Sequence, residues 1–211
     1  MNGAGRPRRI TTIGLTGGIG SGKSTASACL VDCGAWLVDT DAIARALTLP
    51  GGAAIPALAA EFGAGAITAD GALDREKMRQ HVFADAAAKA RLEAILHPLI
   101  GAEARRQAEA SGGRPVVFDV PLLAESSPWR ARVDRILVID CEESTQLARV
   151  SARPGWTEAA ARRVLAQQAT RAARRAIADA VIYNDALTVA QFQAELRALW
   201  ALWRADAGST A

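Results

Sequence analysis

The chain has 211 residues, half of them hydrophobic, and a formal net charge of +3. This length is enough for one sizeable core with a small additional lobe, and so mild a charge suits anionic small substrates without indicating nucleic acid. No apolar run approaches the roughly 18 residues of a membrane span, which argues against a membrane protein. Three cysteines without dense spacing favour a reducing compartment, and packing rather than metal binding at Cys29 and Cys33. We therefore expect a cytoplasmic protein. Its oligomeric state does not follow from the sequence, and a monomer or a weak homo-oligomer is our expectation.

Short apolar runs bounded by turn residues predict five strands. They cover residues 9–16, 35–39, 114–120, 134–140 and 180–184. Longer stretches rich in alanine, leucine and arginine lie between them with helical spacing. This alternation indicates a parallel sheet with helices on both faces. The ends of the chain, 1–9 and 205–211, are expected to be flexible termini.

The segment that follows the first predicted strand is rich in glycine. It fits the pattern G-x-x-x-x-G-K-[ST], with a strand-like run before it and a helix-like run after it. Glycines let successive N–H groups turn toward a phosphate, and the next helix directs its positive end at the same anion. The pattern assigns Lys23 to the β- and γ-phosphates and the Ser24 hydroxyl to Mg²⁺. The predicted nucleotide loop comprises Gly17, Gly18, Ile19, Gly20, Ser21, Gly22, Lys23, Ser24 and Thr25.

Two aspartates close the second predicted strand. In an extended chain Asp39 and Asp41 point to the same side, at the sheet edge where ligands of parallel sheets bind. One of them could accept the proton of an acceptor hydroxyl. The alternative for Asp39 is a cap on the following helix. Arg45, one helical turn after Asp41, is a candidate for holding an anionic substrate group.

The region 47–111 predicts a helical insertion, because it shows no convincing strand. Its longest helical pattern begins near Asp85, which is a candidate cap, and contains Pro98, which is expected to kink or break the helix. A second helical region, 147–178, is rich in arginine. If one helix extends across Arg149 and Arg153, the two share a face, and one of them could clamp a transferring phosphoryl group.

The last predicted helix carries an apolar stripe that we interpret as core. Its members are Phe192, Leu196, Leu199 and Trp203.

A glycine-rich nucleotide loop does not distinguish a kinase from a GTPase or a motor. No lysine of this chain follows an asparagine, so the guanine-reading Asn-Lys-x-Asp of GTPases is absent. The chain is also small for a motor or transporter ATPase. A small-molecule kinase, closing over its substrates to exclude water, fits best. The alternatives are a nucleoside monophosphate kinase, which usually has proline where Ile19 stands, and a nucleotide-dependent binding switch without phosphoryl transfer.

Five segments together resemble the dephospho-coenzyme A kinase family. They occur in one order and read "IGLTGGIGSGKST", "VDTDAIAR", "LHPLI", "DVPLLAE" and "ADAVIYN", and the resemblance covers the chain from residue 10 to about residue 202. The resemblance implies ATP-dependent phosphorylation of the ribose 3′-hydroxyl of dephospho-coenzyme A, with Mg²⁺ and without nucleic acid or membrane partners. It implies a P-loop kinase core over 10–46, 112–146 and 179–204, a helical substrate lobe over 47–111 and a lid over 147–178.

The resemblance also assigns roles to single residues. Asp41 becomes the catalytic base and Arg45 a substrate-side residue. His97, in "LHPLI", falls in the substrate lobe, where it either contacts substrate or is a structural histidine at a helix end. Asp119 resembles an acid that holds Mg²⁺ through water, with a hydrogen-bonding residue at a strand end as the alternative.

Three further positions follow from the same resemblance. Pro121 and Leu122 are expected to shape the wall of the substrate site. Asn184 lines the adenine pocket or serves in packing. The chain departs from the family pattern at Ala124, where a larger apolar residue is usual, and at Ala186, where glycine is usual.

Overall fold

The computed structural model describes residues 11–206. The predicted termini at 1–9 and 207–211 lie outside the described residues, whereas 205 and 206 belong to the last helix. The chain divides into two compact units. We call residues 39–110 the helical unit, and residues 11–38 with 111–206 the sheet unit. The helical unit begins at Asp39, earlier than the substrate lobe expected from residue 47.

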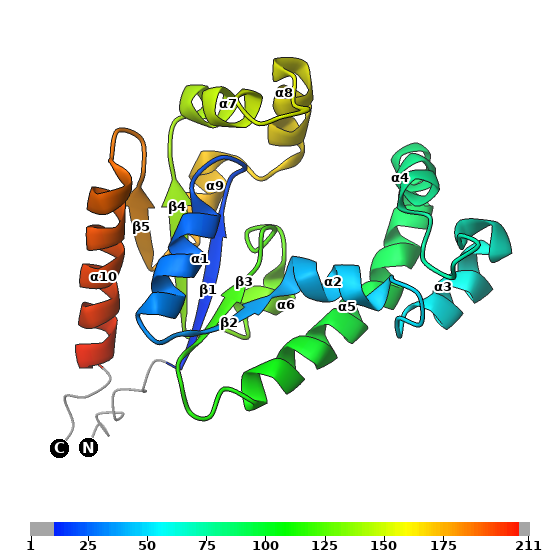
Figure 1. Cartoon of the computed structure of the whole chain (residues 1–211), viewed down its shortest axis with the longest axis horizontal. Coiled ribbons are helices and arrows are strands. Elements are labelled where there is room, and N and C mark those ends of the chain that lie inside the picture. The colour runs from blue at the N-terminus through cyan, green and yellow to red at the C-terminus, as the bar shows by residue number, and fades with distance from the viewer. Residues whose placement is uncertain (1–10, 207–211) are drawn as a thin grey trace, which may run out of the picture. The chain divides into compact units, whose positions relative to one another are not determined.

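The sheet unit is built on five strands in the order β2-β3-β1-β4-β5 (Figure 1). The strands are β1 (Thr12–Gly17), β2 (Trp36–Asp39), β3 (Val116–Asp119), β4 (Arg135–Asp140) and β5 (Ala180–Tyr183). β1 pairs in parallel with β3 and with β4, and β4 pairs in parallel with β5. All five predicted strands are confirmed. Because β1 is central, the loop after it lies where several carboxyl ends meet.

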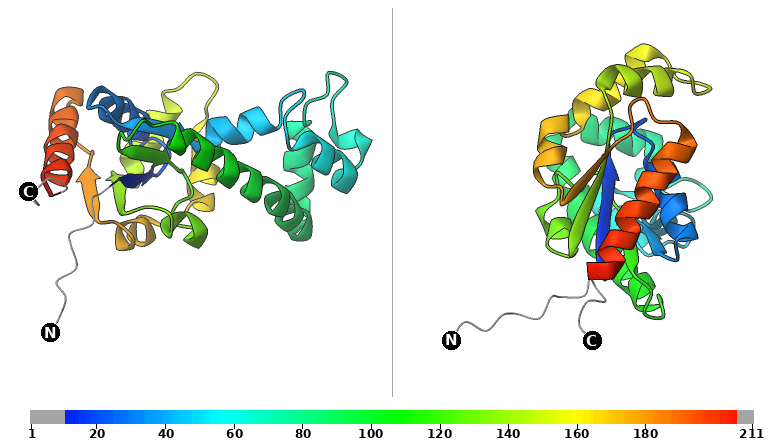
Figure 2. Two further views of the ribbon diagram at one scale, coloured as in Figure 1. Left: turned by 90° about the horizontal axis from the view of Figure 1, so that it is seen from below. Right: turned by 90° about the vertical axis from the view of Figure 1, so that its left-hand side faces the viewer.

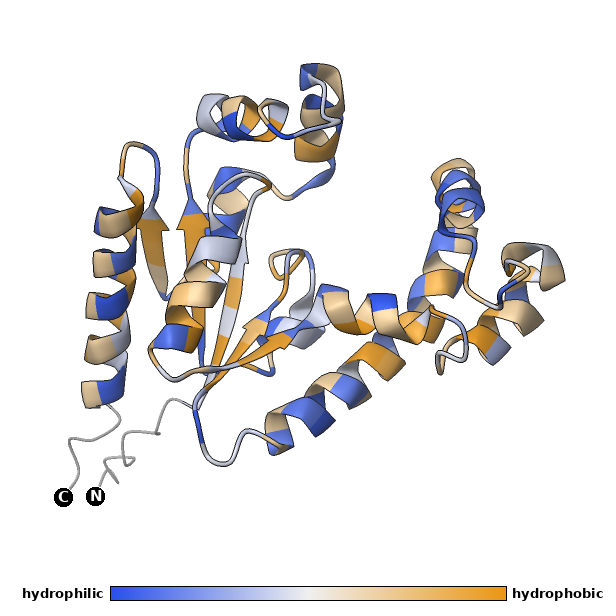
Figure 3. Cartoon of the chain, in the orientation of Figure 1, coloured by the Kyte–Doolittle hydropathy of each residue, from blue (hydrophilic) through white to orange (hydrophobic). Residues whose placement is uncertain are grey.

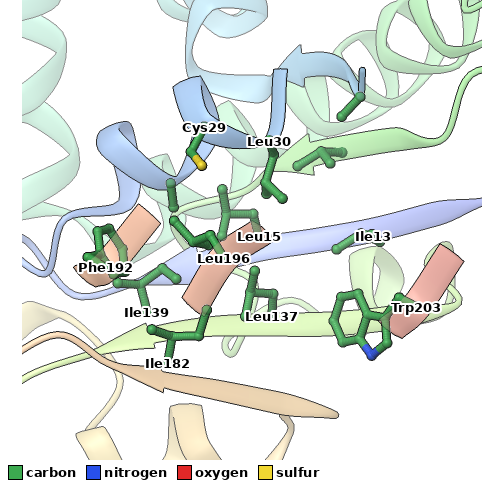
Figure 4. Close-up of a cluster of buried hydrophobic side chains, with 13 residues drawn as sticks. Ile13, Leu15, Cys29, Leu30, Leu137, Ile139, Ile182, Phe192, Leu196 and Trp203 are labelled. Atoms are coloured by element: carbon green, nitrogen blue, oxygen red, sulfur yellow. The ribbon is translucent and has the colours of Figure 1, made fainter. Parts of the chain in front are cut away.

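Helices cover both faces of this sheet, as predicted. Helices α1 (Lys23–Asp32) and α10 (Val189–Asp206) pack on one face, and α9 (Arg171–Ala176) contacts β4 on the other (Figure 2). The shared core joins strand residues such as Leu15 and Leu137 to Leu30 of α1 and Leu196 of α10 (Figure 4). Strands β3, β4 and β5 are accordingly largely apolar when the chain is coloured by hydropathy, whereas the central β1 is paler (Figure 3).

The core confirms two predictions from the sequence. Phe192, Leu196 and Trp203 of the α10 stripe are buried in it, and Leu199 packs against it. Cys29 is fully buried in the same cluster, so its role is packing.

Three further helices of the sheet unit connect its later strands. They are α6 (Ser127–Arg130), α7 (Glu143–Ser151) and α8 (Glu158–Gln167). Because α7 ends at Ser151, the condition under which Arg149 and Arg153 would share a helical face is not met. Pro154 disfavours helical geometry at Arg153, and Gly155 then turns the chain with a positive φ of 78°.

The helical unit contains α2 (Thr40–Leu47), α3 (Ile55–Phe62), α4 (Arg75–Ala84) and α5 (Ala86–Glu109), with a short 3-10 helix at Ala64–Ala66. Over residues 40–110, all of which the structure describes, the one β contact outside named strands is a bridge between Ile67 and Leu73. The expectation of a helical region without strands is confirmed.

Helix α5 shows how a proline is accommodated in this unit. Asp85 caps the helix by accepting a hydrogen bond from the Ala87 N–H at 2.8 Å, as predicted. Pro98 lies inside α5, so it does not break the helix, but the ribbon bends along its length (Figure 1). Proline removes one helical hydrogen bond and crowds the preceding turn, which bends a helix that side-chain packing otherwise maintains.

Within residues 11–206, no helix combines the length and the apolarity needed to cross a membrane.

Candidate active site

The glycine-rich loop connects the buried end of β1 to the first turn of α1. Gly20 and Gly22 have φ angles of 76° and 105°, a conformation that favours glycine. Gly22 occupies the N-cap of α1 without a side-chain cap, and the first turn carries no acidic residue. The first N–H groups of α1, which have no partner within the helix, are therefore available to an anion. Ser24 is exposed at this end of the helix, and Thr25 is half-buried.

Close neighbours explain why the loop tolerates no side chains at two of its positions. A Cβ atom on Gly18 would lie 2.1 Å from Gln146 Nε2, and one on Gly22 would lie 2.4 Å from Asn184 Nδ2. Both separations are far shorter than van der Waals contact, so a substitution would displace a buried carboxamide. The glycines predicted for the cradle thus also allow neighbouring side chains to reach the loop.

Side chains of α7 and of the segment after β5 contact backbone carbonyls of the loop. Gln146 Nε2 donates to the Ile19 carbonyl and Asn184 Nδ2 to the Ser21 carbonyl, each at 2.8 Å. Arg149 Nη1 lies 3.4 Å from the Gly20 carbonyl and 3.5 Å from the Ser21 carbonyl. The structure thus brings two predicted residues, Asn184 and Arg149, to the loop.

Two glutamines contact the backbone of Ile19 in the loop. Gln168, just after α8, accepts a hydrogen bond from the Ile19 N–H at 2.9 Å. Gln146, in α7, has no counterpart among the residues predicted from the sequence. A single glutamine in an amphipathic helix carries no sequence signal that distinguishes it from a surface residue.

Lys23 and Asp119 form an ion pair beneath the loop. Lys23 Nζ contacts Asp119 Oδ1, and the Ser27 hydroxyl donates to Asp119 Oδ2 at 2.9 Å. The side chain of Asp119 is 9% exposed, so its charge is partnered in a largely dry environment. In the sheet register Asp119 lies opposite Leu15, just before the loop, which places this carboxylate at the same edge as Lys23.

Arginines of α9 connect this helix to the end of β4. Arg171 makes two hydrogen bonds to the buried Asp140, at 3.0 Å and 2.9 Å, and also contacts Glu142. The hydrogen bonds to Asp140 raise the pKa of Arg171. Arg174 is buried beside Gly18, and burial lowers the pKa of its guanidinium. These contacts fix α9 close to the start of the loop.

The remaining predicted residues of the sheet unit are Arg153, Pro121 and Leu122. Arg153 is exposed in the segment after α7. The Pro121 carbonyl accepts a hydrogen bond from the Thr16 hydroxyl at 3.0 Å, which holds the chain after β3 against β1. The side chain of Leu122 is 52% exposed, whereas its neighbour Leu123 is fully buried.

The candidate acid-base residues lie in the helical unit. Asp39 is the N-cap of α2 and accepts a hydrogen bond from the Ala42 N–H at 2.8 Å, so the capping alternative is confirmed. Asp41 is already in the first turn of that helix. The premise of an extended chain across the two aspartates is therefore wrong, because α2 begins at Thr40. Asp41 and Arg45 are both exposed and lie one turn apart.

His97 is exposed and lies in the interior of α5. The prediction of a structural histidine at a helix end is wrong in its position, because the helix continues past Pro98 to Glu109.

Comparison with known proteins identifies the family. A family model described as dephospho-CoA kinase matches residues 11–190. The chain belongs to the dephospho-CoA kinase family. A dephospho-CoA kinase from Bordetella parapertussis is 54% identical over 198 residues, covering 93% of this chain and 92% of that protein. One from Burkholderia pseudomallei is 54% identical over 188 residues, covering 89% and 93%.

A known crystal structure also has a fold similar to that of this chain. A crystal structure from Thermus thermophilus superposes with a TM-score of 0.79 at 29% identity, covering 92% of this chain and 98% of that one. The predicted fold class, a P-loop kinase with a parallel five-stranded sheet, is confirmed.

Proposed function

We propose how this chain carries out the dephospho-CoA kinase reaction, in which ATP phosphorylates the ribose 3′-hydroxyl of dephospho-CoA. Family membership gives the activity itself, the final step of coenzyme A biosynthesis. The observation that supports our assignment of the ATP site is the loop after β1. It combines uncapped helix N–H groups with Lys23 at the carboxyl edge of a parallel sheet. ATP is held there through its phosphates.

Mg²⁺ is proposed as the companion of ATP. The described residues contain no group of three or more His, Cys, Asp or Glu side chains placed to hold a metal. A carboxylate and a hydroxyl, from Asp119 and Ser24, are oxygen donors that suit Mg²⁺ bound mainly by nucleotide phosphates and water. We assign Ser24 as a direct ligand and Asp119 as a ligand through water. When bound, the ion offsets phosphate charge.

The helical unit supplies the acceptor side in our proposal. Asp41 accepts the proton of the 3′-hydroxyl as its oxygen attacks the γ-phosphorus, and the bond to the β-phosphate oxygen breaks to release ADP. Arg45 holds an anionic group of the substrate, and His97 contacts it. Exposure of all three side chains is compatible with these roles.

Three parts of the sheet unit have further roles in our proposal. Pro121 and Leu122 form part of its wall, and Asn184 lies beside the adenine. The region 147–178 acts as a lid whose Arg149 or Arg153 stabilises the charge that develops on the phosphoryl group. Arg149 is the better placed, because it already lies near the loop carbonyls.

An acceptor screen tests this proposal. The protein is incubated with Mg-ATP and, in separate reactions, dephospho-CoA, AMP, CMP or no acceptor, and ADP and the phosphorylated product are measured. We expect rapid ADP formation and CoA with dephospho-CoA alone. Turnover with AMP or CMP would instead indicate a nucleoside monophosphate kinase. Tight ATP binding without turnover on any acceptor would indicate a binding switch.

A further inference from the structure

The peptide groups on either side of Ile19 are held by two glutamine side chains. Gln146 Nε2 donates to the Ile19 carbonyl at 2.8 Å, and Gln168 Oε1 accepts from the Ile19 N–H at 2.9 Å. The two glutamines are far from Ile19 in sequence and come from α7 and from the segment directly after α8. They fix both backbone polar groups of one loop residue.

The geometry of the peptide bond carries this constraint to the next residue. In a trans peptide the C=O of one residue and the N–H of the following residue point in opposite directions. By holding the Ile19 carbonyl, Gln146 therefore directs the Gly20 N–H to the other side of the loop. Asn184 acts in the same way on the Ser21 carbonyl and the Gly22 N–H. The loop N–H groups are thus oriented by side chains outside the loop.

Stability alone does not favour a glutamine at position 146. The residue is 1% exposed, and within the described part of the chain its Oε1 has no hydrogen-bond partner. A buried unpaired oxygen costs free energy, and an apolar side chain of the same length would avoid that cost. Its Nε2 also approaches the loop so closely that a side chain at position 18 would displace it. The contact of the Gln146 N–H group with the loop, rather than stability, therefore explains why a glutamine is buried here.

We propose that Gln146, assisted by Gln168, is a positioning residue for phosphate binding. Its carboxamide holds the Ile19 peptide so that the Gly20 N–H faces the polyphosphate of the nucleotide. This inference rests on the proposed function, because it requires ATP to occupy the loop. Gln146 touches no reacting atom and acts through the backbone of Ile19 and Gly20.

The test replaces Gln146 with methionine, which has a similar length and no donor. Gln167→Met is the matched control, since Gln167 is exposed and directly precedes Gln168. We expect Gln146→Met to bind ADP about tenfold more weakly, the loss of one well-oriented hydrogen bond. AMP, which lacks the β-phosphate, should bind within about twofold of wild type. The thermal midpoint should not fall, because the unpaired Oε1 is removed together with the hydrogen bond.

Backbone amide NMR of ¹⁵N-labelled protein separates failure of this inference from failure of the ATP site. ADP should shift the Gly20 N–H resonance in wild type and shift it less in Gln146→Met. If ADP leaves the wild-type loop amides unchanged, the ATP site itself is wrongly assigned. If the loop amides respond in wild type but Gln146→Met retains full ADP affinity, the positioning role is overturned. Equal losses of ADP binding, AMP binding and thermal stability would also overturn it, by showing a purely structural role.

Gln168→Met provides a second variant in case Gln146→Met does not fold. Gln168 borders a cavity of about 280 Å³, so methionine can be accommodated there. We expect a smaller loss of ADP affinity, again with AMP binding retained. Because both glutamines act on Ile19, the double variant should lose less affinity than the product of the single losses. Unchanged ADP affinity in Gln168→Met and multiplicative losses in the double variant would each contradict the shared action.

Discussion

The sheet unit and the helical unit stabilise their polar side chains in different ways. In the sheet unit, contacts join residues far apart in sequence, such as Asn184 with the Ser21 carbonyl and Arg171 with Asp140. In the helical unit many contacts are local, such as Asp39 with the Ala42 N–H and Arg106 with Glu103. Longer contacts, such as Arg75 with Thr48 at 2.6 Å, also occur there.

This difference has a consequence for the proposed reaction. The loop assigned to ATP is held from several directions by side chains of the protein itself, which favours rigid recognition of phosphate. The residues assigned to the acceptor lie exposed on helices of the other unit. We therefore expect changes in the two units to affect ATP affinity and turnover differently.

The largest expected effect comes from Asp41→Asn, which removes the proposed base but retains its shape. Turnover should fall by roughly 10²- to 10⁴-fold, the usual contribution of general base catalysis, while ATP affinity stays near that of wild type. Steady-state kinetics and ADP titration measure the two quantities.

Asp39→Asn is the matched control for this variant. Asparagine caps helices about as well as aspartate, so turnover and stability should both change little. Near-wild-type turnover in Asp41→Asn, or an equal loss in Asp39→Asn, would remove Asp41 from its assigned role.

The next largest effect should come from Lys23→Ala in the sheet unit. Loss of the ammonium should weaken ADP binding and also lower turnover, by about 10²-fold in kcat/KM, because charge stabilisation at the phosphates is lost. Calorimetric titration and initial rates check both. Unchanged ADP affinity together with unchanged kcat/KM would show that the loop is not the ATP site.

A third prediction compares ion pairs of the two units. Arg171→Met removes the bidentate partner of Asp140, which is 1% exposed, and leaves it only the longer contact with Arg175 at 3.5 Å, so the free energy of unfolding should fall by about 2 kcal/mol. Arg106→Met removes an exposed pair with Glu103 in the helical unit and should leave stability essentially unchanged. Urea unfolding measures both, and equal losses would contradict the contrast between the units.

The smallest effect concerns pH. Burial raises the pKa of the Cys141 thiol from about 9 to about 11. Between these values the folded protein keeps a proton that the unfolded chain loses, so the free energy of unfolding falls as pH rises. This loss in the free energy of unfolding reaches up to about 2 kcal/mol at the upper end of the range, and Cys141→Ala should abolish it.

Unfolding measured from pH 8.5 to 10.5 checks this prediction. All three cysteines of the chain lie outside 39–110, so thiol labelling over the same range reports on the sheet unit alone. Parallel pH profiles for wild type and Cys141→Ala would contradict the assignment.

The sequence predicts the strands and the glycine-rich loop of the sheet unit better than the side-chain contacts that hold this loop. Apolar runs identify the strands, and the glycine pattern identifies the loop, because both signals are local. The role of Gln146 depends on contact between α7 and a loop more than 100 residues away, which a single sequence does not encode visibly. The start of α2 at Thr40 is hard to predict because the end of a strand-like pattern and a helix-capping aspartate coincide at Asp39.

The ends of helices near proline are also hard to predict from the sequence. Pro98 lies inside α5, because packing within the helical unit outweighs the local tendency of proline to end a helix. Pro154 and Gly155, in contrast, follow the end of α7 and prevent the helix from continuing. The same residue type therefore has opposite outcomes, and only tertiary context distinguishes them.

The close approach of Gln146 to Gly18 limits how this enzyme can be recombined with its relatives. A chimera that transfers the glycine loop without α7 would keep the motif intact and yet lose the contact between Gln146 and the loop. Loop and helix are thus a single module for protein engineering, although they are distant in the gene.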